Sequence, residues 1–136
     1  MTKPVSIYFP SNVATLDSNA RSLLDDGAVI AGASDWPVST ANVFQAIYQA
    51  ETRKGPAGVL DAGQRVPREA MLYAYTRNAA RALGIEGQNI GVIAPGKQAD
   101  FALLDRDVPT VTSEEARDTK VLWTIVGGKT VAGAKP

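Results

Sequence analysis

Two spacings of apolar residues alternate along the first part of the chain. Residues 5–9 (VSIYF) and 28–33 (AVIAGA) are short apolar runs, which predict strands. Between them, apolar positions in residues 15–26 recur at helical spacing, which predicts a helix. Gly27 follows at the position where a helix commonly ends on a residue with left-handed backbone conformation. The order strand, helix, strand predicts a parallel βαβ unit.

Two further helices are predicted downstream. Residues 40–53 keep an apolar stripe, and Ser39 or Thr40 is the expected N-cap. Residues 67–83 have the most regular helical spacing and begin with a proline, which is harmless at the first helical position. A break is expected near the middle of this segment.

From residue 90 the pattern changes to short strands joined by turns. Pro95 and Gly96 predict a tight turn, because proline presets its first corner and glycine supplies positive φ at the second. Residues 99–105 and 120–126 predict strands joined by a helical turn at 113–117. The glycines at 127 and 128 then turn the second strand back on a third.

The change in pattern divides the chain into two predicted parts of an α/β fold. Residues 1–84 form a βαβα segment and residues 85–136 form a β-rich tail. The tail strands are close in sequence, so their pairing costs little chain entropy. We therefore expect the tail sheet to hold the fold, with Trp123 buried in it.

Composition limits the chemistry that is open to the chain. Its 136 residues suit one domain, and 14 acidic residues balance 14 basic ones, which disfavours nucleic-acid binding. We expect no membrane contact and a cytoplasmic protein, since no apolar stretch approaches the roughly 18 residues of a membrane span and no signal peptide is evident. There is no cysteine and no histidine, so thiolate ligands, the commonest general base and the commonest metal ligand are absent.

The most unusual local stretch is GASDWPV, residues 32–38. Asp35 directly follows a predicted buried strand, and Trp36 and Pro37 come next. The local pattern allows Asp35 to be an acid that caps the following helix. The indole of Trp36 either covers an open end of the core or stacks on a ligand.

Four stretches in order resemble one known family. They are LLDDGAVIAGASDWPV (23–38), YTRNAARALGIE (75–86), NIGVIAPGKQADFALLDRD (89–107) and VLWTIVGGKTV (121–131). Together they resemble the C-terminal end of the metal-dependent amidohydrolase superfamily, in its branch of broad amide and imide hydrolases. The similarity in sequence and in the order of the motifs extends over about residues 20–133.

The resemblance implies a C-terminal fragment of a TIM-barrel hydrolase: its last βα units, plus a small β-sheet tail from a composite β-sandwich. Residues 29–35 then look like the eighth barrel strand. Asp35 looks like its terminal aspartate, a metal ligand and general base at the active-site mouth. Trp36 and Pro37 would border the substrate pocket. Thr76 and Asn78 match the family's T-x-N-A-A stretch and are expected to bond backbone at a helix break.

The rest of the family's metal site has no counterpart in this sequence. Its other ligands are a His-x-His pair on the first barrel strand and later histidines or a carboxylated lysine, whereas this chain has no histidine. Full-length relatives would carry zinc or another divalent metal. We expect no metal cofactor and no catalysis in this chain alone, which would be a truncated hydrolase.

Two alternatives remain open. The chain is either a non-catalytic interaction module that associates with itself, most simply as a dimer, or one half of a split hydrolase that a complementary barrel chain completes. The sequence does not reveal a substrate, because specificity in this family resides largely in barrel loops.

Overall fold

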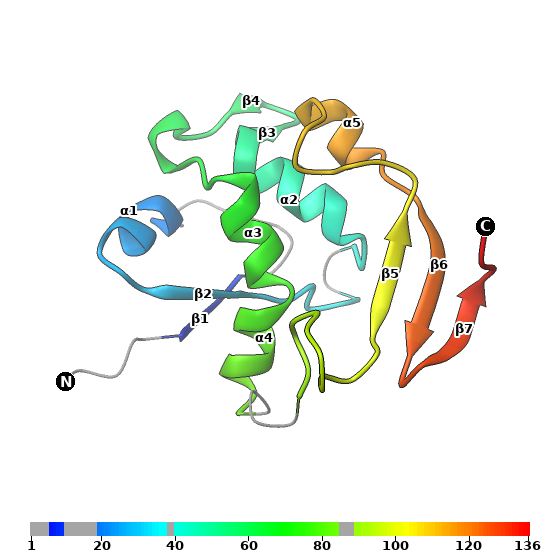
Figure 1. Ribbon diagram of the computed structural model, residues 1–136. Coiled ribbons are helices and arrows are strands. Elements are labelled where there is room, and N and C mark those ends of the chain that lie inside the picture. The colour runs from blue at the N-terminus through cyan, green and yellow to red at the C-terminus, as the bar shows by residue number, and fades with distance from the viewer. Residues whose placement is uncertain (1–5, 10–18, 38–39, 85–88) are drawn as a thin grey trace.

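The computed structural model describes residues 6–9, 19–37, 40–84 and 89–136. Its helices and strands are β1 Ser6–Phe9, α1 Ala20–Asp25, β2 Val29–Gly32, α2 Val43–Thr52, β3 Lys54–Gly55, β4 Gly58–Val59, the 3₁₀ turn η1 Ala62–Gln64, α3 Arg68–Ala74, α4 Arg77–Ala82, β5 Phe101–Leu104, α5 Ser113–Arg117, β6 Val121–Val126 and β7 Lys129–Gly133. The fold is mixed α/β, as predicted (Figure 1).

The first three elements form the predicted βαβ unit. β1 and β2 pair in parallel, from Ser6 opposite Val29 to Phe9 opposite Gly32. Gly27 ends the intervening helix at φ 84°, and its N–H donates to the carbonyl of Leu24 (3.0 Å). A residue with a side chain would be strained at that φ, which explains why the helix stops at a glycine.

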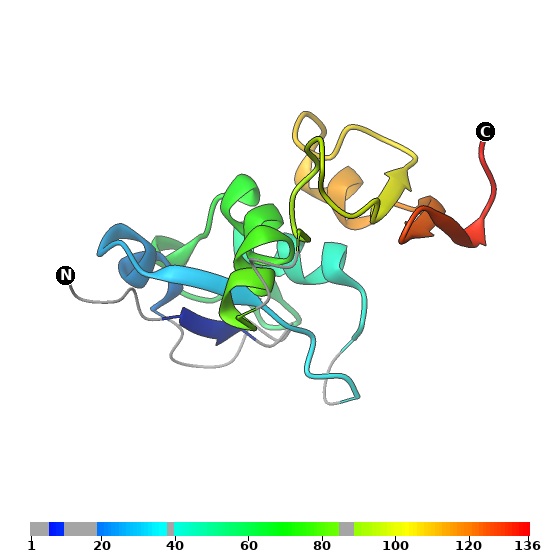
Figure 2. The same cartoon turned by 60° about the horizontal axis from the view of Figure 1, so that its bottom comes forward.

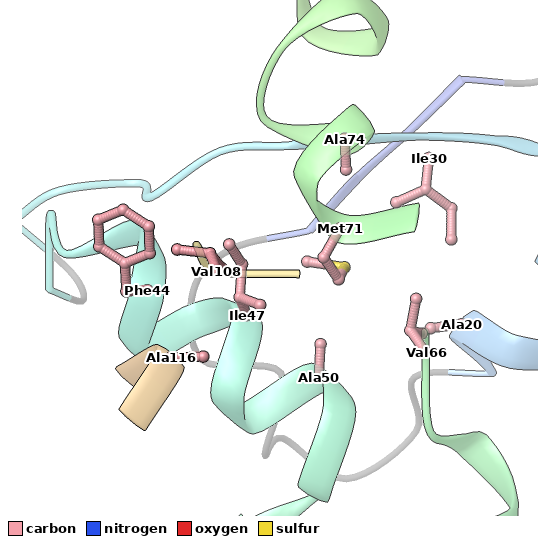
Figure 3. Close-up of a cluster of buried hydrophobic side chains, with 10 residues drawn as sticks. All are labelled: Ala20, Ile30, Phe44, Ile47, Ala50, Val66, Met71, Ala74, Val108 and Ala116. Atoms are coloured by element: carbon pink, nitrogen blue, oxygen red, sulfur yellow. The ribbon is translucent and has the colours of Figure 1, made fainter. Parts of the chain in front are cut away.

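Helices cover one face of β2 and enclose the core. α3 and α4 pack on β2, and α2 lies against α3 and α5. Figure 3 shows side chains from α2 pointing toward those of α3 within a cluster of ten buried apolar residues: Ala20, Ile30, Phe44, Ile47, Ala50, Val66, Met71, Ala74, Val108 and Ala116. The last two follow residue 84, so part of the predicted tail contributes to this core. The predicted boundary at 84/85 stays a prediction.

The tail forms a separate antiparallel sheet in the order β5-β6-β7. Gly127 and Gly128, at φ 55° and 78°, make the turn between its last two strands, as predicted. The sheet lies at the opposite end of the molecule from β1 and β2 (Figures 1 and 2). The segment between β5 and β6 carries the predicted helical turn, which Thr112 and Glu115 start with a reciprocal capping box.

The prediction that the tail sheet holds the fold with Trp123 buried is wrong. No residue of β5, β6 or β7 is fully buried, and Trp123 is half-buried, with its Nε1 donating to Thr130 Oγ1 (2.9 Å). Chain proximity favours the pairing of these strands, but pairing alone does not cover their faces. A residue becomes buried only where a second layer packs over it.

The expected N-cap of α2 is also wrong. The helix starts later, at Val43, and Asn42 caps it by accepting from the N–H of Phe44 (3.0 Å). The hydroxyl of Thr40 instead accepts from the N–H of Asn42 (3.1 Å), one turn before the helix. Ser39 lies outside the described residues.

The helix break near Thr76 is confirmed. α3 ends at Ala74 and α4 begins at Arg77, and the Thr76 hydroxyl donates to the carbonyl of Leu72 (2.8 Å). Asn78 Nδ2 donates to the carbonyl of Ile30 on β2 (3.0 Å). Both side chains therefore bond backbone, as expected, and Asn78 ties α4 to the strand that leads to Asp35.

Candidate functional site

Asp35 lies just beyond the carboxyl end of β2. Its side chain is exposed and its backbone adopts φ 49°, in the left-handed region that aspartate tolerates better than most residues. It does not cap α2, because Asn42 holds that position. The capping interpretation of Asp35 is therefore wrong, and the described structure gives this carboxylate no other structural task.

Trp36 and Pro37 follow Asp35 on the surface. Trp36 is 70% exposed, so the interpretation that its indole covers an open end of the core is wrong. The Ser34 hydroxyl accepts from the N–H of Trp36 (3.3 Å) and shapes the turn, in which the bond between Trp36 and Pro37 is cis. An exposed indole beside an exposed carboxylate can contact a ligand or another segment of protein.

The strand end below Asp35 is fixed by a close contact that sequence reasoning missed. A Cβ built on Gly32 would lie 2.9 Å from carbons of the Tyr75 ring, so the ring packs directly on the strand backbone. Burial raises the pKa of the Tyr75 hydroxyl, whose oxygen is buried and makes no hydrogen bond within the described residues. The available signal was Gly32 itself, because a glycine inside an apolar strand marks a close approach.

The described residues do not form a metal site. They contain no group of three or more His, Cys, Asp or Glu side chains that could hold a metal ion. Catalytic zinc sites use three protein ligands, commonly histidines, and Asp35 offers one carboxylate in a chain without histidine. The residues present therefore do not fit zinc or a similar divalent metal.

The two described cavities lie away from Asp35, Trp36 and Pro37, and none of these three residues lines either one. A cavity of about 550 Å³ lies beside the first half of β2, and a more apolar groove of about 830 Å³ lies between α3–α4, α2 and β5. The structure thus places the three predicted site residues together on one exposed turn but does not enclose them.

Among the helices within the described ranges, none is long and apolar enough to cross a bilayer.

Comparison with known proteins places the chain in a family. Residues 7–132 match the Amidohydrolase family, so the chain belongs to it. It is 37% identical over 109 residues to N-substituted formamide deformylase of Arthrobacter pascens, across 79% of this chain and 20% of that protein. It is 35% identical over 111 residues to Protein LONG AFTER FAR-RED 3 of Arabidopsis thaliana, across 80% of this chain and 19% of that protein.

A solved structure has the same fold over most of the chain. The match to an amidohydrolase from Thermotoga maritima MSB8 has a TM-score of 0.61 at 25% identity, and it covers 85% of this chain and 26% of that one. The chain therefore spans about a fifth to a quarter of the length of these relatives. The resemblance inferred from the four sequence stretches is confirmed at the level of the family.

Proposed function

We propose that this chain is the C-terminal portion of a metal-dependent amidohydrolase that hydrolyses non-peptide C–N bonds, and that the chain is inactive on its own. The observation that carries the proposal is the position of Asp35. It stands exposed just beyond the carboxyl end of a parallel strand, with no structural task among the described residues, in a member of the amidohydrolase family.

The topology supports a barrel fragment. β1, α1 and β2 form a parallel βαβ unit, the repeating unit of a TIM barrel, and α3–α4 pack on β2 as outer helices pack on a barrel strand. Active sites of such barrels lie at the carboxyl ends of the strands, which is where Asp35 lies. The β5-β6-β7 sheet then corresponds to part of the composite β-sandwich.

In this proposal Asp35 supplies one carboxylate to a metal site whose other ligands lie outside this chain. Trp36 and Pro37, exposed on the same turn, border the substrate pocket of the assembled enzyme. The name of the Arthrobacter relative suggests an N-substituted amide as a first substrate class. The inactivity of the isolated chain follows from its lack of histidine.

A chimera tests the proposal. This chain replaces the matching segment of the Arthrobacter deformylase, and hydrolysis of an N-substituted formamide is measured with zinc present. We expect the chimera to be active and the isolated chain to be inactive. Asp35→Asn should lower kcat of the chimera at least 100-fold, because it removes a metal-binding carboxylate.

Asp61→Asn is the matched control. Asp61 is also an exposed aspartate with positive φ (46°), but it lies in the loop before η1. Its substitution should leave activity within twofold, and both variants should melt like the parent chimera. Hydrolysis by the isolated chain with added zinc, or full activity of a folded Asp35→Asn chimera, would refute the proposal.

We propose as the alternative that the chain is a non-catalytic module that associates with itself, or one half of a split hydrolase that a complementary barrel chain completes. Large apolar side chains are exposed at Leu83 (65%), Ile93 (81%) and Val131 (60%), and β7 is an open sheet edge. Analytical ultracentrifugation should then show a dimer of the isolated chain at micromolar concentration. A monomer at every concentration excludes self-association.

A further inference from the structure

The cavity of about 550 Å³ carries an unusual balance of charge. It lies between the first half of β2, helices α3–α4 and the segment after residue 89, away from Asp35. Its lining residues are Leu24, Ala28, Val29, Ile30, Ala70, Tyr73, Arg77, Asn78, Arg81, Ile90, Val92 and Lys97. Among these described residues three are cationic and none is acidic, although the chain as a whole has equal numbers of acidic and basic residues.

Most arginines elsewhere in the described part bond a carboxylate or, like Arg53 and Arg65, a backbone carbonyl. Four carboxylate pairs join Arg21 to Asp25, Arg68 to Glu51, Arg106 to Asp105 and Arg117 to Asp118, at 2.7 to 2.8 Å. Arg77 differs, because its guanidinium stacks on the Tyr73 ring, 3.6 Å from the centroid, and donates no hydrogen bond to a described residue. Stacking uses the face of the guanidinium and leaves its N–H edge for an anion.

The other polar groups of the cavity define where that anion can bind. Lys97 Nζ lies 3.4 Å from the neutral Asn89 Oδ1, so it has an amide rather than a carboxylate beside it. Asn78 is already engaged with the carbonyl of Ile30, so it serves the strand and not a ligand. The cationic side of the cavity is therefore formed by Arg77 and Lys97.

The remaining wall is apolar. Leu24, Ala28, Val29 and Ala70 offer a surface without charge, and a volume of about 550 Å³ suits a small molecule. A bare inorganic ion would leave this surface in water. A ligand with an anionic head and a compact apolar body uses both sides.

We propose that this cavity binds a small organic anion. Its carboxylate or phosphate head accepts hydrogen bonds from the edge of the Arg77 guanidinium and is attracted by Lys97. Its apolar body rests on Leu24, Val29 and Ala70. This site is distinct from Asp35 and does not depend on the proposed hydrolase activity.

Titration of the isolated chain tests the site. Benzoate and phenyl phosphate distinguish the two kinds of anionic head, and benzamide is the neutral match of the same size. Calorimetry should show saturable binding of at least one anion, at least tenfold tighter than benzamide and weaker at high salt. Backbone NMR shifts should change at Val29, Ala70 and Arg77.

Arg77→Gln should weaken binding of the anion at least fivefold, and Lys97→Gln, outside the helices, should weaken it in the same direction. Arg117→Gln is the matched control, because Arg117 also lies over a tyrosine ring, that of Tyr48 (5.2 Å), but has Asp118 as its carboxylate partner. The Arg117→Gln variant should bind the anion with unchanged affinity. Equal binding of benzamide, equal weakening by Arg117→Gln, or no saturable binding of either anion overturns the proposal.

Discussion

The helical body around β2 and the sheet β5-β6-β7 differ in how they are stabilised. In the body, Ile47 and Met71 are 1% and 2% exposed and touch side chains from several elements (Figure 3). In the sheet, Leu103, Leu122 and Val126 are 39%, 45% and 49% exposed. The sheet is ordered by backbone pairing and turns, whereas the body is ordered by burial, and burial is the larger contribution to folding.

A partly buried ionic cluster helps to join the two regions. Arg68 on α3 donates to both carboxylate oxygens of Glu51 on α2 (2.8 and 2.9 Å) and to the carbonyls of Val108 and Val111 (2.7 and 2.6 Å). The last two residues lie between β5 and α5. Through Arg68 the body therefore holds the connection that leads into the sheet.

The largest contrast should come from truncating one apolar side chain in each region. Met71→Ala should lower the free energy of unfolding by about 2–5 kcal/mol, because it leaves a cavity among packed side chains. Leu122→Ala on the exposed sheet should cost about 1 kcal/mol or less. Urea unfolding of both variants measures the difference. Equal costs would mean that the sheet is covered in solution.

Removing Arg68 should have the next largest effect. The side chains of Arg68 and Glu51 are 11% and 24% exposed, so Arg68→Met leaves a partly buried carboxylate and two carbonyls without donors. We expect a loss of about 2–3 kcal/mol, with faster amide exchange in β5 and β6. Arg21→Met, at the exposed pair with Asp25, is the control and should cost about 0.5 kcal/mol or less. Similar losses would show that Arg68 does not join the regions.

Trp123 tests the sheet directly. Since Trp123 is half-buried, Trp123→Ala should cost about 1–2 kcal/mol, less than the roughly 3–5 kcal/mol of a fully buried aromatic side chain. Trp123→Phe keeps the ring but removes the donor to Thr130 and should cost about 1 kcal/mol. Chemical denaturation of the two variants separates these contributions. A cost above 3 kcal/mol for Trp123→Ala would restore the prediction of a buried tryptophan.

The smallest of these effects should come from acid, which should destabilise the segment between β5 and β6. The Arg106 guanidinium holds the pKa of Asp105 well below its ordinary value, and hydrogen bonds from the N–H and hydroxyl of Thr112 lower that of Glu115. Because both folded pKa values are lowered, the stabilisation is complete above the unfolded values of about 4 and is lost as pH falls through the folded ones.

The melting temperature should therefore fall modestly below about pH 4, and less so in Asp105→Asn, which lacks the titrating group. Thermal melts at intervals from pH 7 to pH 2.5 measure the change. A melting temperature that rises in acid would contradict the assigned direction.

Much of the local structure could be predicted because it depends on neighbouring residues. The glycines at 27, 96, 127 and 128 adopt positive φ where the pattern requires it. The break at Thr76 and the helical turn at 113–117 depend on side chains that bond nearby backbone. The family could be recognised from the order of four short stretches, which records ancestry and needs no knowledge of packing.

Burial was decided by tertiary structure. Trp36 and Trp123 are both large aromatic residues, yet no second layer covers them fully. The contact of Gly32 with Tyr75 and the cavity around Arg77 join residues from separate elements. Sequence periodicity shows which side of an element is apolar, but the opposing surface that buries it, or leaves it exposed, is set by contacts between distant parts of the chain.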